Sequence, residues 1–374
     1  MRLRYQMKTA ILHDWIFDKF HPEFSLLELM SIFQNASIYT IGHNDNASML
    51  SEFSEQLHSM KVGKSRPQVW NYIHDFPELI EKTPLDSYDL VISNTRGPMN
   101  WVKRYQWSKG EPGYHISYSH DSYADIYLGY DRPFGNFWST FDEEDRLRYQ
   151  KMDLEFMKGV DLLISSSKLA ATKLSRDYEK ESTVVYYPLP DHLWQMNQEA
   201  SEFYLAWGFF DQSKSLSTLV DLFNHIPDKL IFIGEGDGKE DWKKKCADNI
   251  TLLSPMDWPE LNWYLARARG FITTEPFKIH MLPAVAAARG VPLISYQYAA
   301  GAEFIIEGKS GISYEQNNVD ALASAFFAFQ DQAWSSQTVR ESLFTIRNGS
   351  FKESLRKVFA EKLPKDILLS NLGD

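Results

Sequence analysis

Residues 271–311 read FITTEPFKIHMLPAVAAARGVPLISYQYAAGAEFIIEGKSG. A short apolar strand ends at an acidic residue, Glu275, and the pattern then predicts a helix over residues 283–290 and a second apolar strand over 291–295. In a doubly wound α/β domain, strand ends that face a cleft bind ligands, and helix N-termini there favour anions. Glu275 is therefore the first candidate for a functional side chain, although capping the next helix is the simpler role for an isolated acid.

Length and composition predict an ordinary globular protein. The chain has 374 residues, of which 44% are hydrophobic and 14% aromatic, and this is enough for two domains with separate cores. The single cysteine, Cys246, excludes a disulfide framework and a cysteine zinc site and fits a reducing compartment. We find neither an apolar run of about 18 to 20 residues nor a signal-peptide region, so a cytoplasmic enzyme or binding protein is expected.

The charge distribution limits the partners. A net charge of -11 would repel a polyanionic backbone, so we expect no nucleic-acid partner. One segment mixes aromatic and basic side chains, which is compatible with peripheral contact at a membrane or with a phosphorylated lipid: Trp101, Lys103, Arg104, Tyr105, Trp107 and Lys109. A solvated loop or helix face is the favoured interpretation. The acidic run 142–145 is expected to complement a helix dipole, and we predict no metal site.

Apolar strands alternate with helical patterns along the chain. The first half has strand patterns at 9–13, 37–41, 88–93, 114–119, 160–165 and 182–187. After a proline-bearing connection, the alternation restarts with strands at 203–208, 229–234, 249–253, 270–274 and 291–295. Such alternation predicts parallel sheets covered on both faces, in two domains that meet near residues 190–200. A last helix is expected over 348–363, with one apolar stripe formed by Phe351, Leu355, Val358 and Phe359.

Several stretches together resemble the retaining glycosyltransferases of family 4, also called glycosyltransferase group 1. They are HDWIF (13–17), YHISYSH (114–120), VDLLISSSKLAATKL (160–174), KLIFIGEGDG (229–238) and LNWYLARARGFITTEPF (261–277). The resemblance implies a GT-B fold, in which two Rossmann-like domains have parallel sheets facing a central cleft. It assigns residues 1–192 to the acceptor side and 193–347 to the nucleotide-sugar side, with a tail, 348–374, whose helix crosses back to the first domain.

The resemblance also implies a reaction and a set of site residues. Family members transfer a sugar from a nucleotide diphosphate donor to a glycan or glycolipid hydroxyl with retention of configuration, and they need no further cofactor. The positions matching the family's catalytic residues are Glu275, beside the donor sugar, and His120, beside the acceptor. Donor-binding positions match Lys214, on the diphosphate, and Gly208, Phe277, Lys278 and Ile279. On the acceptor side, the matching positions are Asp14 and Arg96.

The chain departs from the family pattern at three places. The family's second acid, which holds the ribose, falls on Pro283 or Val285, and Phe209 stands where a diphosphate arginine is common. His21 and Pro22 replace the Gly-Gly loop of the first domain. Losing the ribose clamp and one cation would each cost donor binding about 1 to 3 kcal/mol unless other groups replace them. The candidates for such replacement are Lys278, His280, Lys19 and Arg96.

Two hypotheses follow from these matches and departures. The preferred one is a divergent retaining transferase that builds a surface polysaccharide, a glycan or a glycolipid. The alternative is a catalytically silent relative that keeps the two-domain shell to bind a glycan or a partner transferase. A phosphorylase or an epimerase on the same fold is a third reading, for which the sequence holds no dedicated motif.

Overall fold

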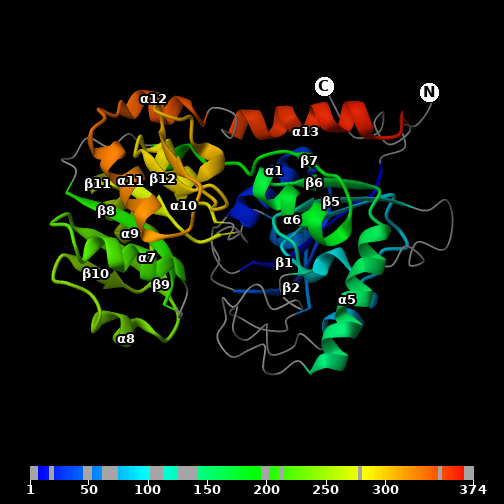
Figure 1. Cartoon of the computed structure of the whole chain (residues 1–374). Coiled ribbons are helices and arrows are strands. Elements are labelled where there is room, and N and C mark those ends of the chain that lie inside the picture. Colours follow the sequence, from blue (N-terminus) through cyan, green and yellow to red (C-terminus); the bar gives the residue numbers. More distant parts are fainter. Residues whose placement is uncertain are drawn as a thin grey trace. The chain divides into compact units, whose positions relative to one another are not determined.

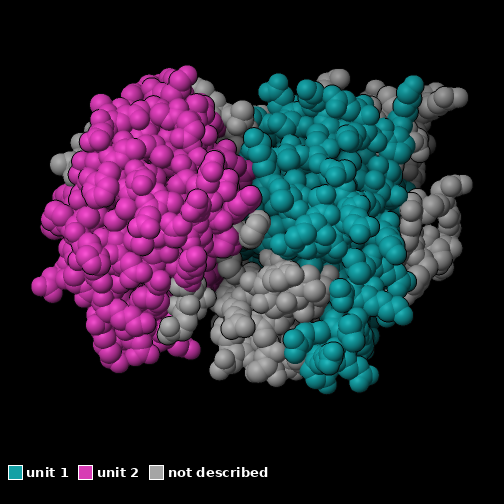
Figure 2. Space-filling model, viewed as in Figure 1, with its two compact units in different colours: residues 1–131, 141–188, 348–374 teal, residues 132–140, 189–347 magenta. Residues whose placement is uncertain are grey.

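The computed structural model describes residues 7–16, 21–44, 53–60, 75–101, 113–124, 142–194, 202–210, 214–276, 280–343 and 348–365. These residues form two compact units (Figure 2). Unit 1 comprises the described residues within 1–131, 141–188 and 348–374, and those of unit 2 lie within 189–347. The last helix therefore belongs to the first unit, as the sequence predicted.

The described part of unit 1 is built on a parallel sheet with the order β3-β2-β1-β4-β5-β6-β7. Its strands are β1 (Thr9–Ile16), β2 (Ser37–His43), β3 (Leu57–Ser59), β4 (Leu90–Thr95), β5 (Tyr114–Ser119), β6 (Leu162–Ser165) and β7 (Thr183–Val184). Its helices are α1 (His21–Ile32), α3 (Phe76–Glu81), α5 (Glu143–Lys158), α6 (Lys168–Tyr178) and α13 (Asn348–Lys362), with short 3₁₀ turns η2 (Ser54–Gln56) and η4 (Pro98–Asn100) (Figure 1).

The described part of unit 2 is a second parallel sheet with the order β10-β9-β8-β11-β12-β13. Its strands are β8 (Phe203–Phe209), β9 (Leu230–Glu235), β10 (Ile250–Leu253), β11 (Ala268–Thr273), β12 (Leu293–Tyr296) and β13 (Gly311–Tyr314). Its helices are α7 (Lys214–Phe223), α8 (Lys239–Lys243), α9 (Trp258–Arg267), α10 (Leu282–Ala288), α11 (Val319–Gln330) and α12 (Ser336–Glu341), with 3₁₀ turns η7 (Asp191–Leu193) and η8 (Ala302–Phe304).

Both sheets have the doubly wound strand order, which defines where a ligand is expected. Each sheet is extended from its first strand in two opposite directions, so the order reverses between β1 and β4 in unit 1 and between β8 and β11 in unit 2. At such a switch point the loops leaving two neighbouring strands diverge to opposite faces, and ligands of open α/β sheets bind outside the carboxyl ends of these strands. A functional site is therefore expected at the carboxyl ends of β1 and β4 in unit 1 and of β8 and β11 in unit 2.

Helix α13 completes the core of unit 1 and lies beside α1 (Figure 1). Its predicted stripe is confirmed, because Phe351, Leu355, Val358 and Phe359 are all buried in the cluster that also contains apolar side chains of α1 and the sheet. The rings of Phe359 and Phe33 lie 6.1 Å apart between centroids. Burying apolar surface stabilises the folded state by about 25 cal/mol per Å². Because its apolar stripe is buried in this core, α13 contributes to the stability of unit 1.

Two smaller sequence predictions are also decided by the structure. Asp142 caps α5, since its carboxylate accepts a hydrogen bond from the backbone N–H of Asp145 at 2.8 Å, in agreement with the helix-dipole interpretation. Trp101 is buried at 2% exposure and donates from Nε1 to Asp153, so it is not part of the solvated surface that was expected for residues 101–109. The other residues of that segment lie outside the described ranges.

Among the helices of the described ranges, none combines the length and the apolar character needed to cross a membrane.

Candidate functional site

The switch point of unit 2 brings Gly208 and Glu275 together. Gly208 is the penultimate residue of β8, and Glu275 follows the end of β11 by two residues. A Cβ atom placed on Gly208 would lie 3.6 Å from Cγ of Glu275 and 3.0 Å from the ring of Phe232. The half-buried Glu275 thus stands directly over the end of β8, and a side chain at position 208 would occupy the space beside it.

Lys214 begins α7 at the same edge of the sheet. The next residue, Ser215, donates its Oγ proton to the carbonyl of Thr274 at 3.0 Å, and Thr274 Oγ1 donates in return to the carbonyl of Ser215 at 3.3 Å. The start of α7 is therefore tied to the residue that precedes Glu275. Lys214 is exposed and lies in the first helical turn, where the dipole favours an anion over a cation. A bound anion would remove this conflict.

Residues Phe277, Lys278 and Ile279 lie outside the described residues, and the chain resumes at His280. The ring of His280 lies 4.3 Å from that of Trp207 between centroids, and its Nδ1 accepts from the backbone N–H of Leu282 at 3.3 Å. The residue after the segment is thus held both against β8 and at the beginning of α10. Lys19, another suggested replacement for the missing donor contacts, also lies outside the described ranges.

Helix α10 shows what replaces the family's second acid. Pro283 and Val285 are both buried, Val285 at 0% exposure, and the helix reads LPAVAAA without a carboxylate. At the position of the missing arginine, Phe209 is 9% exposed and its ring lies 5.1 Å from that of Trp207. The side chains at both places that depart from the family pattern therefore make apolar contacts within unit 2. None of Pro283, Val285 and Phe209 provides a polar side-chain group to a nucleotide.

The switch point of unit 1 holds Asp14, which is 4% exposed. Its carboxylate accepts hydrogen bonds from Oγ1 of Thr95 at 2.6 Å, from the backbone N–H of Arg96 at 2.7 Å and from that of Met99 at 3.1 Å. Burial raises the pKa of Asp14 above its usual value, and these three hydrogen bonds oppose the rise. Asp14 therefore fixes the loop after β4, which presents the half-buried Arg96.

His120 follows β5, beside the end of β4, and is 0% exposed. Its backbone N–H donates to the carbonyl of Thr95 at 2.8 Å, which extends the β-ladder by one residue. Its Nε2 lies 2.7 Å from Oδ1 of Asn94 and 3.3 Å from Oγ of Ser25. Burial lowers the pKa of His120 well below its usual value, and the charge of Arg96, together with that of His13 when His13 is protonated, lowers it further. His120 is consequently neutral at pH 7.

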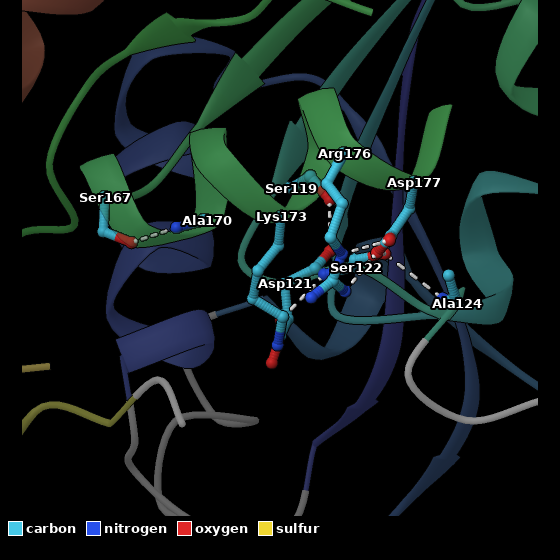
Figure 3. Close-up of polar contacts among 9 residues, drawn as sticks. All are labelled: Ser119, Asp121, Ser122, Ala124, Ser167, Ala170, Lys173, Arg176 and Asp177. Atoms are coloured by element: carbon cyan, nitrogen blue, oxygen red, sulfur yellow. Dashed lines mark hydrogen bonds and ion pairs between the residues drawn. The ribbon is translucent and has the colours of Figure 1, made fainter. Parts of the chain in front are cut away.

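Helix α6 holds the segment that follows His120 (Figure 3). Lys173, only 1% exposed, forms an ion pair with Asp121, and Ser122 donates its Oγ proton to the carboxylate of Asp177. Asp177 also accepts a bidentate contact from Arg176. Separating Lys173 from Asp121 would leave a buried charge uncompensated, so the ion pair holds the backbone at Asp121 against α6. The position of His120 is therefore fixed from the sheet on one side and from α6 on the other.

The sequence did not identify several of these residues. Lys173 has the appearance of a surface lysine on an amphipathic helix, and only its place in the buried stripe distinguishes it. Asn94 follows the apolar run at the start of β4 in the motif ISNTRG, and a polar residue near a strand end was a usable signal. Within the described residues we find no cluster of three or more His, Cys, Asp or Glu side chains that could hold a metal ion.

Comparison with known proteins agrees with this architecture. Residues 204–330, from β8 to α11, match the family model described as "Glycosyl transferases group 1". No curated protein sequence matches the chain.

Solved structures match nearly the whole chain. The apo form of the lipopolysaccharide outer core galactosyltransferase WaaB has a TM-score of 0.66 and 13% identity over 96% of this chain and 100% of its own. Sucrose-phosphate synthase from Thermosynechococcus elongatus has a TM-score of 0.68 and 16% identity over 95% and 100%. Anabaena HepE in complex with UDP and glucose has a TM-score of 0.66 and 13% identity over 95% and 99%. The predicted α/β class, with two Rossmann-like domains of GT-B type, is confirmed.

Proposed function

We propose that the chain is a glycosyltransferase that moves a sugar from a nucleotide diphosphate sugar to a glycan or glycolipid hydroxyl with retention of configuration. One observation carries the proposal: within the segment that matches the glycosyltransferase family model, Glu275 stands beside Gly208 at a switch point, and the residues next to Lys214 and Glu275, Ser215 and Thr274, are hydrogen-bonded to each other. A carboxylate, a close backbone approach and a cation are what a sugar diphosphate requires.

The chemistry places most of the work on charge and orientation. In retaining transfer without a protein nucleophile, the diphosphate leaves as an oxocarbenium-like centre develops, and the acceptor enters from the same face. Lys214 would stabilise charge on the leaving diphosphate, and Glu275 would accept a hydrogen bond from a sugar hydroxyl. On the acceptor side we propose His120 and Arg96, with Asp14 acting by fixing the loop that presents Arg96.

The donor is proposed to be a uridine diphosphate sugar. The structurally similar HepE is described with UDP, with UDP and glucose, and with UDP-glucose. Because such similarity at 11 to 13% identity concerns the fold, the choice of nucleotide is tested directly. Isothermal titration with the diphosphates of uridine, guanosine, adenosine and thymidine, and with their common sugars, should show binding of uridine compounds first.

The alternative function, a catalytically silent binding protein, is favoured by one specific observation. Val285 and Phe209 fill with buried apolar contacts the positions that hold ribose and diphosphate in the family. If no nucleotide binds at millimolar concentration while an immobilised glycan is retained, the silent function is supported and the transferase proposal fails. Nucleotide binding followed by sugar release to an acceptor or to water would exclude it.

A further inference from the structure

Asn94 occupies the centre of a buried polar cluster in unit 1. It is the fifth residue of β4, at 0% exposure, and its strand lies between β1, which carries His13, and β5, which precedes His120. Its backbone carbonyl lies 2.8 Å from Nδ1 of His13, and its side-chain Oδ1 lies 2.7 Å from Nε2 of His120. A single residue therefore contacts both imidazole rings through two oxygen atoms.

The orientation of the Asn94 amide follows from its third contact. Nδ2 lies 2.8 Å from the carbonyl oxygen of Pro22, which can only accept, so the NH₂ group faces Pro22 and Oδ1 faces His120. Since Oδ1 can only accept, Nε2 of His120 must carry the proton. Ser25 donates its own hydroxyl proton to Pro22 at 3.2 Å, which leaves its oxygen as a second acceptor near His120 Nε2.

The same reasoning assigns the proton on His13. A contact of 2.8 Å to the carbonyl of Asn94 requires a proton on Nδ1, because two acceptors would repel each other at this distance. The longer contact of 3.2 Å from Nδ1 to Asn94 Nδ2 then joins two donors and is not a hydrogen bond. Nε2 of His13 holds the lone pair, and within the described residues this buried atom has no hydrogen-bond partner.

Burial makes protonation of either imidazole ring to the cation unfavourable. His13 is 2% exposed and His120 is 0% exposed, and the charge of Arg96 acts on His120. Burial lowers the pKa of His13 to about 4, with its backbone hydrogen bonds opposing the change. Both rings are therefore neutral near pH 7, with opposite tautomers.

We propose that Asn94 is a positioning residue that fixes two opposite neutral tautomers, with the proton on Nδ1 in His13 and on Nε2 in His120. The lone pair of the His120 ring is then on Nδ1, and the ring has no positive charge. The role of His120 in the reaction rests on the proposed glycosyl transfer. In that reaction His120 orients an acceptor hydroxyl by accepting a hydrogen bond from it, and it does not act as a cation against the diphosphate.

The first test needs no variant and no turnover. Two-bond ¹H–¹⁵N correlation spectra of the full chain labelled with ¹⁵N-histidine distinguish the tautomers, and the variants His13→Asn and His120→Gln assign the two signals. Each replacement keeps a donor at the position of the native N–H. The wild type should show Nε2–H for His120 and Nδ1–H for His13 at pH 7. The reverse pattern for either ring, or a charged ring, would overturn the proposal.

The second test changes Asn94 itself. Asn94→Ala removes the acceptor and should allow His120 to populate both tautomers, whereas Asn94→Asp should raise the pKa of His120 by placing a carboxylate against Nε2. The control is Asn100→Ala, because Asn100 is buried in the same unit and its Oδ1 accepts from Ser117. A tautomer ratio unchanged in Asn94→Ala, or changed equally in the control, would contradict the assignment.

The third test connects the tautomer to turnover. Asn94→Ala should lower kcat by about 10-fold and leave KM for the donor within about twofold, since unit 2 carries the proposed donor residues. In Asn94→Asp the new carboxylate should move the acidic limb of the pH profile to higher pH. Arg96 and His13, the other groups that act on His120, are unchanged in this variant. If no transfer is found for the wild type, the proposed function fails while the spectra still decide the role of Asn94.

Discussion

A Cβ atom on Gly208 would lie 3.6 Å from Cγ of Glu275, which makes the two residues immediate neighbours although 66 positions separate them in the chain. This relationship predicts the effect of Gly208→Ala. The methyl group would lie 3.0 Å from a ring atom of Phe232, which can yield slightly, so we expect the fold to persist. Donor affinity should fall on the order of 10-fold, because the methyl group displaces Glu275 or a ligand beside it. Calorimetric titration with a nucleotide sugar would measure this, and unchanged affinity would remove position 208 from the donor site.

The two charged residues of the proposed donor site, Glu275 and Lys214, give a second prediction. Glu275→Gln and Lys214→Ala should each lower the rate of transfer by about 10-fold or more, because each removes a directed charge. The matched controls are Glu260→Gln on α9 and Lys229→Ala before β9, both exposed in the same unit. Initial rates with saturating acceptor would compare the four proteins. Equal rates in test and control variants would refute the roles assigned to Glu275 and Lys214.

The pH dependence of stability follows from His13. Its pKa is about 4 in the folded chain and 6.5 without the fold, so the folded state disfavours the charged ring. The stabilisation is complete above pH 6.5 and is lost as the pH falls towards 4, by about 3 kcal/mol at 1.36 kcal/mol per unit. His120 acts in the same direction. The protection factors of amides in β1 and β5, which are exchange rates corrected for the intrinsic rate at each pH, should fall on acidification. In His13→Asn, which cannot titrate, this fall should be smaller, and an equal dependence would contradict the assignment.

The ion pair between Lys173 and Asp121 gives a fourth prediction. Lys173→Met should destabilise unit 1 by about 2 to 4 kcal/mol, because Asp121 is 14% exposed and loses its compensating charge. The double variant with Asp121→Asn should be less destabilised than the two single effects would give if they were independent. Denaturant titration of the four members of this cycle would measure the coupling. Strict additivity would show that the two side chains do not interact.

Helix α13 gives a fifth prediction through Phe351, which packs edge-on against Tyr118 with ring centroids 5.6 Å apart. Phe351→Ala should lower the free energy of unfolding of unit 1 by about 3 to 5 kcal/mol, because it leaves a cavity under the helix. Phe327→Ala on α11 is the control, since its side chain is 49% exposed and its loss should change stability by about 0.5 kcal/mol or less. Urea titration would compare them, and similar losses would place α13 outside the core.

The sequence predicted the central strands and the edge strand β10 well, and the other three edge strands poorly. Continuous apolar runs such as those of β1, β5 and β8 are buried on both faces, so the pattern alone identified them. β3 has no fully buried residue, β13 has only two, and neither was predicted. β7 was expected over 182–187 but pairs only at 183–184. Each lies at the edge of its sheet, where one neighbour is missing and a short strand needs no apolar run.

The same distinction applies to the candidate site. Glu275 and Lys214 each belong to a local motif, so a resemblance could point to them, and hydrogen bonds connect the neighbouring residues Thr274 and Ser215. Asn94 acts through His13, Pro22 and His120, which lie on three other segments of the chain. No periodicity in one strand reports such a contact, because the partner depends on which strands are neighbours and in what register.

The position of α13 has a consequence for biosynthesis. The ribosome synthesises residues 348–362 only after all of unit 2. Until then, the apolar surface of unit 1 against which Phe351, Leu355 and Phe359 pack is exposed. Domains generally fold as they emerge, and uncovered apolar surface on such an intermediate invites aggregation. Expression yield of this protein should therefore respond to chaperone supply, and arrested chains that stop before residue 348 should leave their first unit sensitive to protease.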